Sequence, residues 1–159
     1  MSLYNIKSEQ YLPIDINTAW SFFSSAKNLA IITPPEMDFK ICTNLTEKEI
    51  YEGMKIDYTL RPILNIKVKW QTEIGKTEKN HFFTDKQLKG PYSIWEHKHT
   101  FVPVNEGVMM YDDVKYKLPL GIIGTIAHTL FVRKQLEKIF NYRKEILDKI
   151  FNKNASSIN

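Results

Sequence analysis

Two histidines and one aspartate are the residues whose types and spacing could carry out acid–base chemistry. His97 and His99 are two residues apart, and Asp112 lies in the following strand-like segment. Histidine can accept or donate a proton near neutral pH. A carboxylate on the inner face of a sheet is costly unless paired, and a histidine paired with it holds a proton more readily. One hypothesis is therefore an enzyme with His97 or His99 as acid or base and Asp112 as orienting group.

Other kinds of chemistry find less support. A His-x-His pair can chelate zinc, but a zinc site needs a third protein ligand, and Asp112 is the only inward candidate. We therefore predict no metal site. No serine or cysteine lies in a nucleophile elbow, and the six glycines are scattered rather than gathered in a phosphate-binding loop. The sequence accordingly predicts no cofactor.

Alternation along the two last strand-like segments, 92–104 and 108–118, determines which side chains share a face. A two-residue loop at Glu106-Gly107 would turn both apolar faces inward. A three-residue turn with a glycine bulge would instead place the apolar face of one strand on the opposite side of the sheet from that of the other. The apolar periodicity favours the shorter loop. In that register the inward pairs are Trp95 with Leu118, His97 with Tyr116, His99 with Val114 and Phe101 with Asp112, and the outward pairs include Glu96 with Lys117 and Thr100 with Asp113.

The predicted inner face combines aromatic side chains with few polar groups, as pockets for small apolar ligands do. Ordinary core packing of the aromatic residues and purely structural hydrogen bonds of the histidines remain open alternatives. The preferred hypothesis is binding of a small, largely hydrophobic molecule, without catalysis. The candidate ligand-binding residues are Trp70, Trp95, His97, His99, Asp112 and Tyr116.

A series of strands between helices must position these residues. Short links between strand-like segments favour an antiparallel meander, and a helical period follows the last of them. A helix of about 28 residues must lie across a sheet to bury its apolar stripe. The expected strands are 3–12, 37–44, 54–61, 64–75, 80–88, 92–104 and 108–118; the expected helices begin at Asp15 or Asn17, cover 26–32 and run from Ile122 to Phe151.

This order of elements is similar to that of the START and polyketide-cyclase-like superfamily (SRPBCC, helix-grip). Four segments resemble a bacterial ligand-binding subfamily: Asn28 to Pro35, Gly90 to Phe101, Tyr116 to Gly121 and Phe131 to Leu136. The resemblance implies an α+β helix-grip fold in which a curved seven-stranded antiparallel sheet, two short helices and a long C-terminal helix enclose a hydrophobic cavity. For the binding hypothesis the resemblance implies a lipid- or polyketide-like ligand, and for the enzyme hypothesis a polyketide cyclase- or dehydrase-like reaction. It implies no shared catalytic residues, since the superfamily includes binders, carriers and enzymes.

Bulk properties narrow the class further. The 159 residues, 43% hydrophobic and 25% charged, fit one domain, expected over 1–153 with a disordered tail at 154–159. The net charge is +4, but the lysine and arginine residues are scattered among acidic ones, which argues against nucleic-acid binding. A single cysteine, Cys42, expected to be buried, indicates a reducing compartment, and neither a signal peptide nor a membrane span is evident. We expect a cytoplasmic protein, with a homodimer left open.

Overall fold

The computed structural model describes residues 3–62, 65–119, 126 and 131–155. Within them, seven strands form one antiparallel sheet in the order β1-β7-β6-β5-β4-β3-β2. The predicted meander is therefore confirmed, with the first strand added beside the last. The strands are β1 (Tyr4–Leu12), β2 (Lys40–Ile41), β3 (Lys55–Leu60), β4 (Val68–Glu78), β5 (Phe82–Lys89), β6 (Ile94–Val104) and β7 (Gly107–Lys117).

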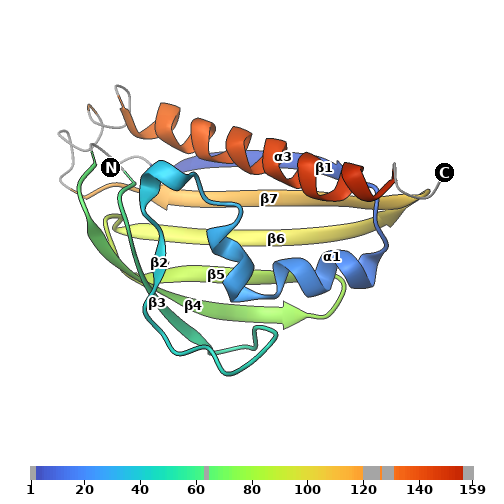
Figure 1. Cartoon of the computed structure of the whole chain (residues 1–159). Coiled ribbons are helices and arrows are strands. Elements are labelled where there is room, and N and C mark those ends of the chain that lie inside the picture. The colour runs from blue at the N-terminus through green and yellow to red at the C-terminus, as the bar shows by residue number, and fades with distance from the viewer. Residues whose placement is uncertain (1–2, 63–64, 120–125, 127–130, 156–159) are drawn as a thin grey trace.

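The helices lie on the concave side of the bent sheet (Figure 1). They are α1 (Ile16–Phe23), the 3₁₀-helices η1 (Ala26–Ala30) and η2 (Pro35–Met37), and the long α3 (Arg133–Ala155). Of the two predicted caps, Asp15 is the one that caps α1, because its side chain accepts hydrogen bonds from the backbone N–H groups of Asn17 and Thr18. Gln10 of β1 donates to the Lys144 carbonyl at 2.9 Å and so fixes α3 to the sheet edge.

The long helix was expected to run from Ile122 to Phe151, and α3 is described from Arg133 to Ala155. Its predicted beginning at Ile122 lies outside the described residues, as does most of the segment before α3. At the other end α3 continues through Ala155, so it includes the first two residues of the tail expected at 154–159. Residues 156–159 lie outside the described part of the chain.

Two strands differ from their predicted extents by three or more residues at each end. The segment 37–44 contributes only the two-residue β2, because η2 occupies its start and Asp38 then takes a left-handed conformation at φ 46°. The strand expected at 64–75 begins at Val68 and continues to Glu78. Asn65, at φ 57°, interrupts the extended backbone that the alternation suggested, and Ile66 is left 59% exposed.

The register of β6 against β7 differs from the prediction by two residues. The loop is Asn105-Glu106, with Glu106 at φ 60°, and Val104 pairs with Gly107. A side chain at Gly107 would overlap the Leu12 carbonyl, so this glycine serves the close approach of β1 rather than the turn. Because the shift is even, every side chain keeps its predicted face. The pairs are Trp95 with Tyr116, His97 with Val114, His99 with Asp112 and Phe101 with Met110, and outward Glu96 with Lys115 and Thr100 with Tyr111.

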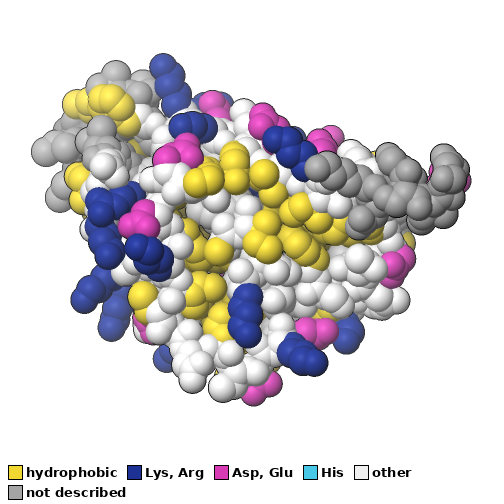
Figure 2. Space-filling view, viewed as in Figure 1, with side chains coloured by type: hydrophobic (Ala, Val, Ile, Leu, Met, Phe, Trp, Pro, Cys, Tyr) yellow, Lys and Arg dark blue, Asp and Glu magenta, His cyan; other side chains and the backbone are white. Residues whose placement is uncertain are grey.

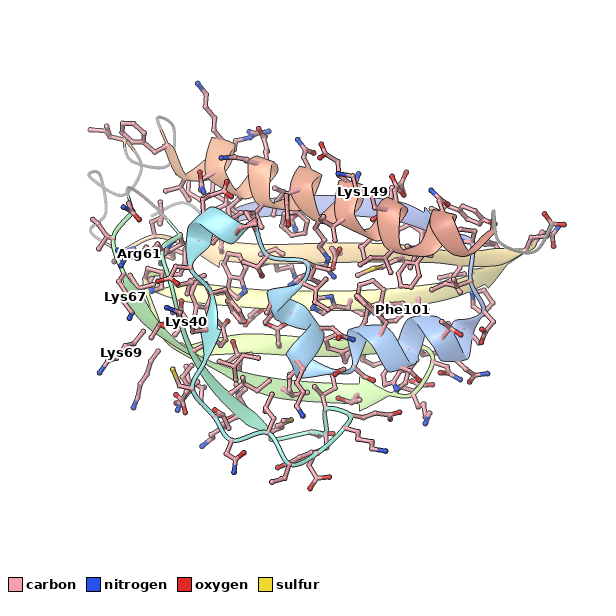
Figure 3. All side chains as sticks on the ribbon, viewed as in Figure 1. Lys40, Arg61, Lys67, Lys69, Phe101 and Lys149 are labelled. Atoms are coloured by element: carbon pink, nitrogen blue, oxygen red, sulfur yellow. The ribbon has the colours of Figure 1, made fainter. Side chains whose placement is uncertain are left out.

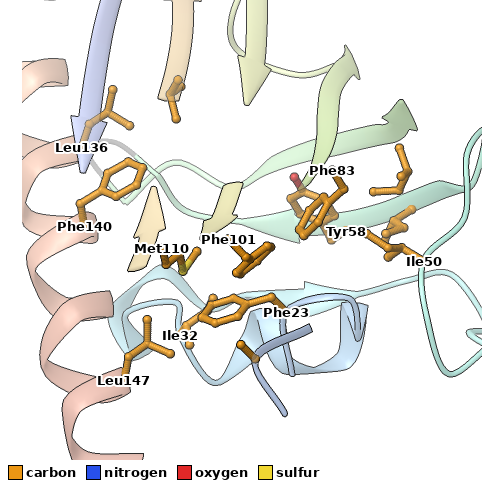
Figure 4. Close-up of a cluster of buried hydrophobic side chains, with 14 of the residues drawn as sticks. Phe23, Ile32, Ile50, Tyr58, Phe83, Phe101, Met110, Leu136, Phe140 and Leu147 are labelled. Carbon is orange, nitrogen blue, oxygen red and sulfur yellow. The ribbon is translucent and has the colours of Figure 1, made fainter. Parts of the chain in front are cut away.

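A hydrophobic core lies between the sheet and the helices (Figure 4). On the α1 side, the core is built around Trp20, which is 2% exposed. Its ring packs edge-on against Phe83 and Phe101, at centroid distances of 6.1 and 6.0 Å. Figure 3 shows Phe101 on β6 beside α1. Leu147 of α3 is fully buried and closes the core from the other side. α1 and α3 are therefore both packed onto one face of the sheet.

Cys42 is exposed, contrary to the expectation that it is buried, because it follows the short edge strand β2 rather than lying within a longer strand. No helix in the described ranges combines the length and apolar character needed to cross a membrane.

Candidate functional site

Five charged or titratable side chains from three adjacent strands and α3 meet on the inner face of the sheet. The sheet register brings four of them together. Asp85 of β5 lies opposite His97 of β6, and Asp112 of β7 lies opposite His99 of β6. Since His97 and His99 are two residues apart on β6, both point to the same side. Arg143 reaches the group from α3, and it is 8% exposed. We call these five residues the His–Asp cluster.

Each imidazole of the His–Asp cluster lies between two carboxylates. Asp112 Oδ1 is 2.8 Å from His97 Nε2 and 2.9 Å from His99 Nδ1. Asp85 Oδ2 is 3.1 Å from His99 Nε2 and 3.7 Å from His97 Nδ1. His97 Nε2 with Asp112 and His99 Nε2 with Asp85 have hydrogen-bond geometry, whereas the 2.9 Å contact of His99 Nδ1 is a close polar contact without that alignment. The two rings are 3.7 Å apart between centroids.

Burial and neighbouring charges shift the pKa values of Asp112, His97 and His99 in different directions. Burial alone would raise the pKa of Asp112, but the charge of Arg143, whose Nη1 is 3.5 Å from Oδ1, and contacts with both histidines hold it well below its usual value. Burial and the neighbouring His99 lower the pKa of His97. Burial also opposes the charged form of His99, but Asp112 and Asp85 outweigh it and raise the His99 pKa. One imidazolium and Arg143 together can therefore offset the two carboxylates.

A cavity of about 200 Å³ lies beside the cluster, between the sheet, η1 and α3. Hydrophobic side chains come to the surface on this face of the molecule below α3 (Figure 2). Most of the lining is aliphatic or aromatic, and the charged part of the wall consists of Asp85, His97, His99 and Arg143. An apolar pocket with a few converging polar groups is the usual form of a small-molecule site.

The six residues proposed from the sequence do not all reach this cavity. Trp70, Trp95, His97 and His99 line it. Asp112 and Tyr116 are not among its lining residues. Asp112 contacts the far nitrogens of the two histidines, and Tyr116 is 1% exposed, with its ring 5.9 Å from Tyr92 and 6.1 Å from Trp95.

Sequence reasoning missed Asp85 and Arg143, although each carries a signal. Asp85 alternates with Phe83 on β5, so it shares the inner face with a buried ring. Arg143 lies three residues after Phe140 and four before Leu147, on the buried stripe of α3, where an arginine is unusual. A charged residue at a core position of either element indicates a buried partner.

Comparison with known proteins confirms the fold. No protein-family model and no curated protein matches the sequence. Among solved structures, KanY protein (ms6282) matches with a TM-score of 0.71 at 13% identity, over 96% of this chain and 99% of that one. A START superfamily protein from Mycobacterium smegmatis matches at 0.69 and 12% identity over 94% and 97% of the two chains. The major latex-like protein 151 of Panax ginseng matches at 0.67 and 9% identity, also over 94% and 97%.

At such low identity these matches bear on the fold alone. They show that the chain has the helix-grip fold which its resemblance to the START and polyketide-cyclase-like superfamily implied. A curved sheet of seven strands, short helices and a long C-terminal helix are the elements that the sequence predicted.

Proposed function

We propose that the chain binds a small, largely hydrophobic molecule in the cavity between the sheet and α3, without converting it. The observation that carries the proposal is the cavity itself, about 200 Å³, apolar over most of its wall and charged at one side. An apolar cavity of roughly 150 Å³ accommodates benzene. The volume here suits a compact lipid- or polyketide-like molecule of one or two rings, or a short chain, better than a long lipid.

The lining indicates how such a molecule would be oriented. Trp70 and Trp95, with ring planes at 90° to each other, offer aromatic surfaces to its apolar part. Arg143 Nε is buried without a hydrogen-bond partner among the described residues, and Arg143 lines the same cavity. A buried donor of this kind suits an acceptor oxygen on the ligand. We place this role in the cytoplasm, because a single exposed thiol fits a reducing compartment.

Filling the cavity tests the proposal. Ala26 and Ala30 lie on η1, but Ala26 lines the cavity whereas Ala30 is exposed and is not part of the lining. Ala26→Phe places a ring in the space that a ligand would occupy, so we expect the dissociation constant for 2-naphthoate to rise at least about tenfold, roughly 1.4 kcal/mol. Isothermal titration calorimetry measures this change.

Ala30→Phe is the matched control, since it adds the same ring to the same helix outside the cavity. Its dissociation constant should stay within about twofold of the parent value. Equal binding by Ala26→Phe and the parent would contradict the proposal. So would the absence of any binding by the parent to 2-naphthoate and octanoate, together with native mass spectra that show no co-purified molecule.

Catalysis is the second candidate, and one observation favours it. His97, His99 and Asp112 share a face and are in contact, and both histidines line the cavity. The enzyme hypothesis needs this arrangement. Poly-β-ketone probes incubated with the protein and analysed by mass spectrometry separate the two functions. Binding alone returns the probe unchanged. A cyclase returns an isomer with a different chromatographic retention, and a dehydrase returns a product that has lost water.

A further inference from the structure

We propose that Asp85, His97 and His99 bind a divalent transition-metal ion, such as Zn²⁺, on the wall of the cavity. The sequence predicted no metal site because Asp112 was the only third ligand in view. Asp85 supplies that ligand instead, from the strand on the other side of β6. The site requires no organic ligand, so it stands independently of the proposed function.

The donor atoms are close enough together for one ion. One atom from each of the three residues lies within 4.8 Å of the other two. His99 Nε2 is 3.1 Å and His97 Nδ1 is 3.7 Å from Asp85 Oδ2. A tetrahedral ion with bonds of about 2.0–2.2 Å holds its ligand atoms roughly 3.3 Å apart. Small side-chain rotations therefore suffice, and two imidazoles with one carboxylate form a donor set used by zinc and non-haem iron sites.

The other nitrogen of each histidine faces a second carboxylate. Asp112 Oδ1 is 2.8 Å from His97 Nε2 and 2.9 Å from His99 Nδ1. Histidines that bind metals usually direct their remaining ring nitrogen to a carboxylate or carbonyl, which orients the ring and selects its tautomer. Asp112 is placed to do this for His97 through a hydrogen bond, whereas its contact with His99 Nδ1 is close but lacks hydrogen-bond alignment. Arg143 balances the charge of Asp112. Two histidines that served only packing would not need carboxylates at both ends.

Access distinguishes the two carboxylates. Asp85, His97 and His99 line the cavity, whereas Asp112 does not. The ion would therefore bind on the cavity side, with Asp112 behind the histidines. Three protein ligands leave at least one coordination position for a water molecule or a ligand oxygen. That position would face the cavity.

Metal titration of the full chain tests the site. Chelator-treated protein is titrated with Zn²⁺ by calorimetry and with Co²⁺ by visible absorption, which reports the coordination of the bound ion. We expect one ion per chain. Asp85→Asn and His99→Gln should each weaken binding by at least about a hundredfold, and Asp112→Asn, which only positions the ligands, by about tenfold to a hundredfold.

His81→Gln is the matched control, because His81 is exposed and paired only with Glu78 in the described structure, away from the cavity. It should bind both ions as the parent does. Circular dichroism identifies variants that are not folded, and the parent stoichiometry tests the site without any variant. The proposal is overturned if the folded parent binds no ion at near-unit stoichiometry. It is equally overturned if folded Asp85→Asn and His99→Gln match the parent, or if His81→Gln abolishes binding.

Discussion

Replacing Asp112 by asparagine should lower the free energy of unfolding by about 3–5 kcal/mol. The carboxylate is 6% exposed and contacts His97, His99 and Arg143. Its removal leaves the Arg143 guanidinium, itself 8% exposed, without that neighbouring negative charge. An unpaired buried charge costs far more than the net benefit of the original pair. Urea denaturation of parent and variant measures the difference.

Asp113→Asn provides the control at the next position. Asp113 points to the outer face, where it accepts a hydrogen bond from Asn5 and pairs with Lys7 at 3.3 Å. A surface pair of this kind is worth at most about 1 kcal/mol. Adding Arg143→Leu to Asp112→Asn removes the stranded cation, so the double variant should cost less than the two single variants summed. Similar losses for Asp112→Asn and Asp113→Asn would show that the buried contacts carry no special energy.

The fold was predictable because it depends on periodicity and on short connections. Alternation placed Trp95, His97 and His99 on one face of β6 without knowledge of its neighbours. The register was not fixed in the same way, because Gly107 resembles a turn glycine although its lack of a side chain accommodates β1. That constraint comes from a strand about a hundred residues away in sequence, so local turn chemistry could not reveal it.

The candidate site was predictable only in part. Parity showed that the histidines and Asp112 face inward, and they do contact one another. It could not show that Asp85 lies next to His99, since pairing across β5 and β6 depends on a further register. The presence of Arg143 depends on how α3 is rotated over the sheet. The separation of sheet and helix determines which inward residues line a cavity. Trp95 lines the cavity, whereas Tyr116 is buried in the packed core.

Trp20→Ala should also destabilise the protein by about 3–5 kcal/mol, through the loss of a large buried ring and the cavity left behind. Trp20 contacts Phe83 and Phe101, so its removal takes one ring contact from each, although Phe101 keeps Phe23 of α1 at a centroid distance of 5.4 Å. Phe83 in turn stacks on His99 at a centroid distance of 4.2 Å. The vacated space therefore lies behind the ring that supports the His–Asp cluster. Urea denaturation followed by circular dichroism measures the loss.

Trp20→Phe separates the contribution of the ring from that of its polar group. Trp20 Nε1 is buried without a hydrogen-bond partner among the described residues, so phenylalanine removes an unsatisfied donor while keeping most of the apolar contact. Its cost should be less than half that of Trp20→Ala. If the two variants lose equal stability, the indole N–H makes an interaction that the packing of α1 does not explain. If Trp20→Ala costs less than about 1 kcal/mol, the α1 side of the core collapses onto the vacated space, and Phe83 does not depend on Trp20 for its position beside His99.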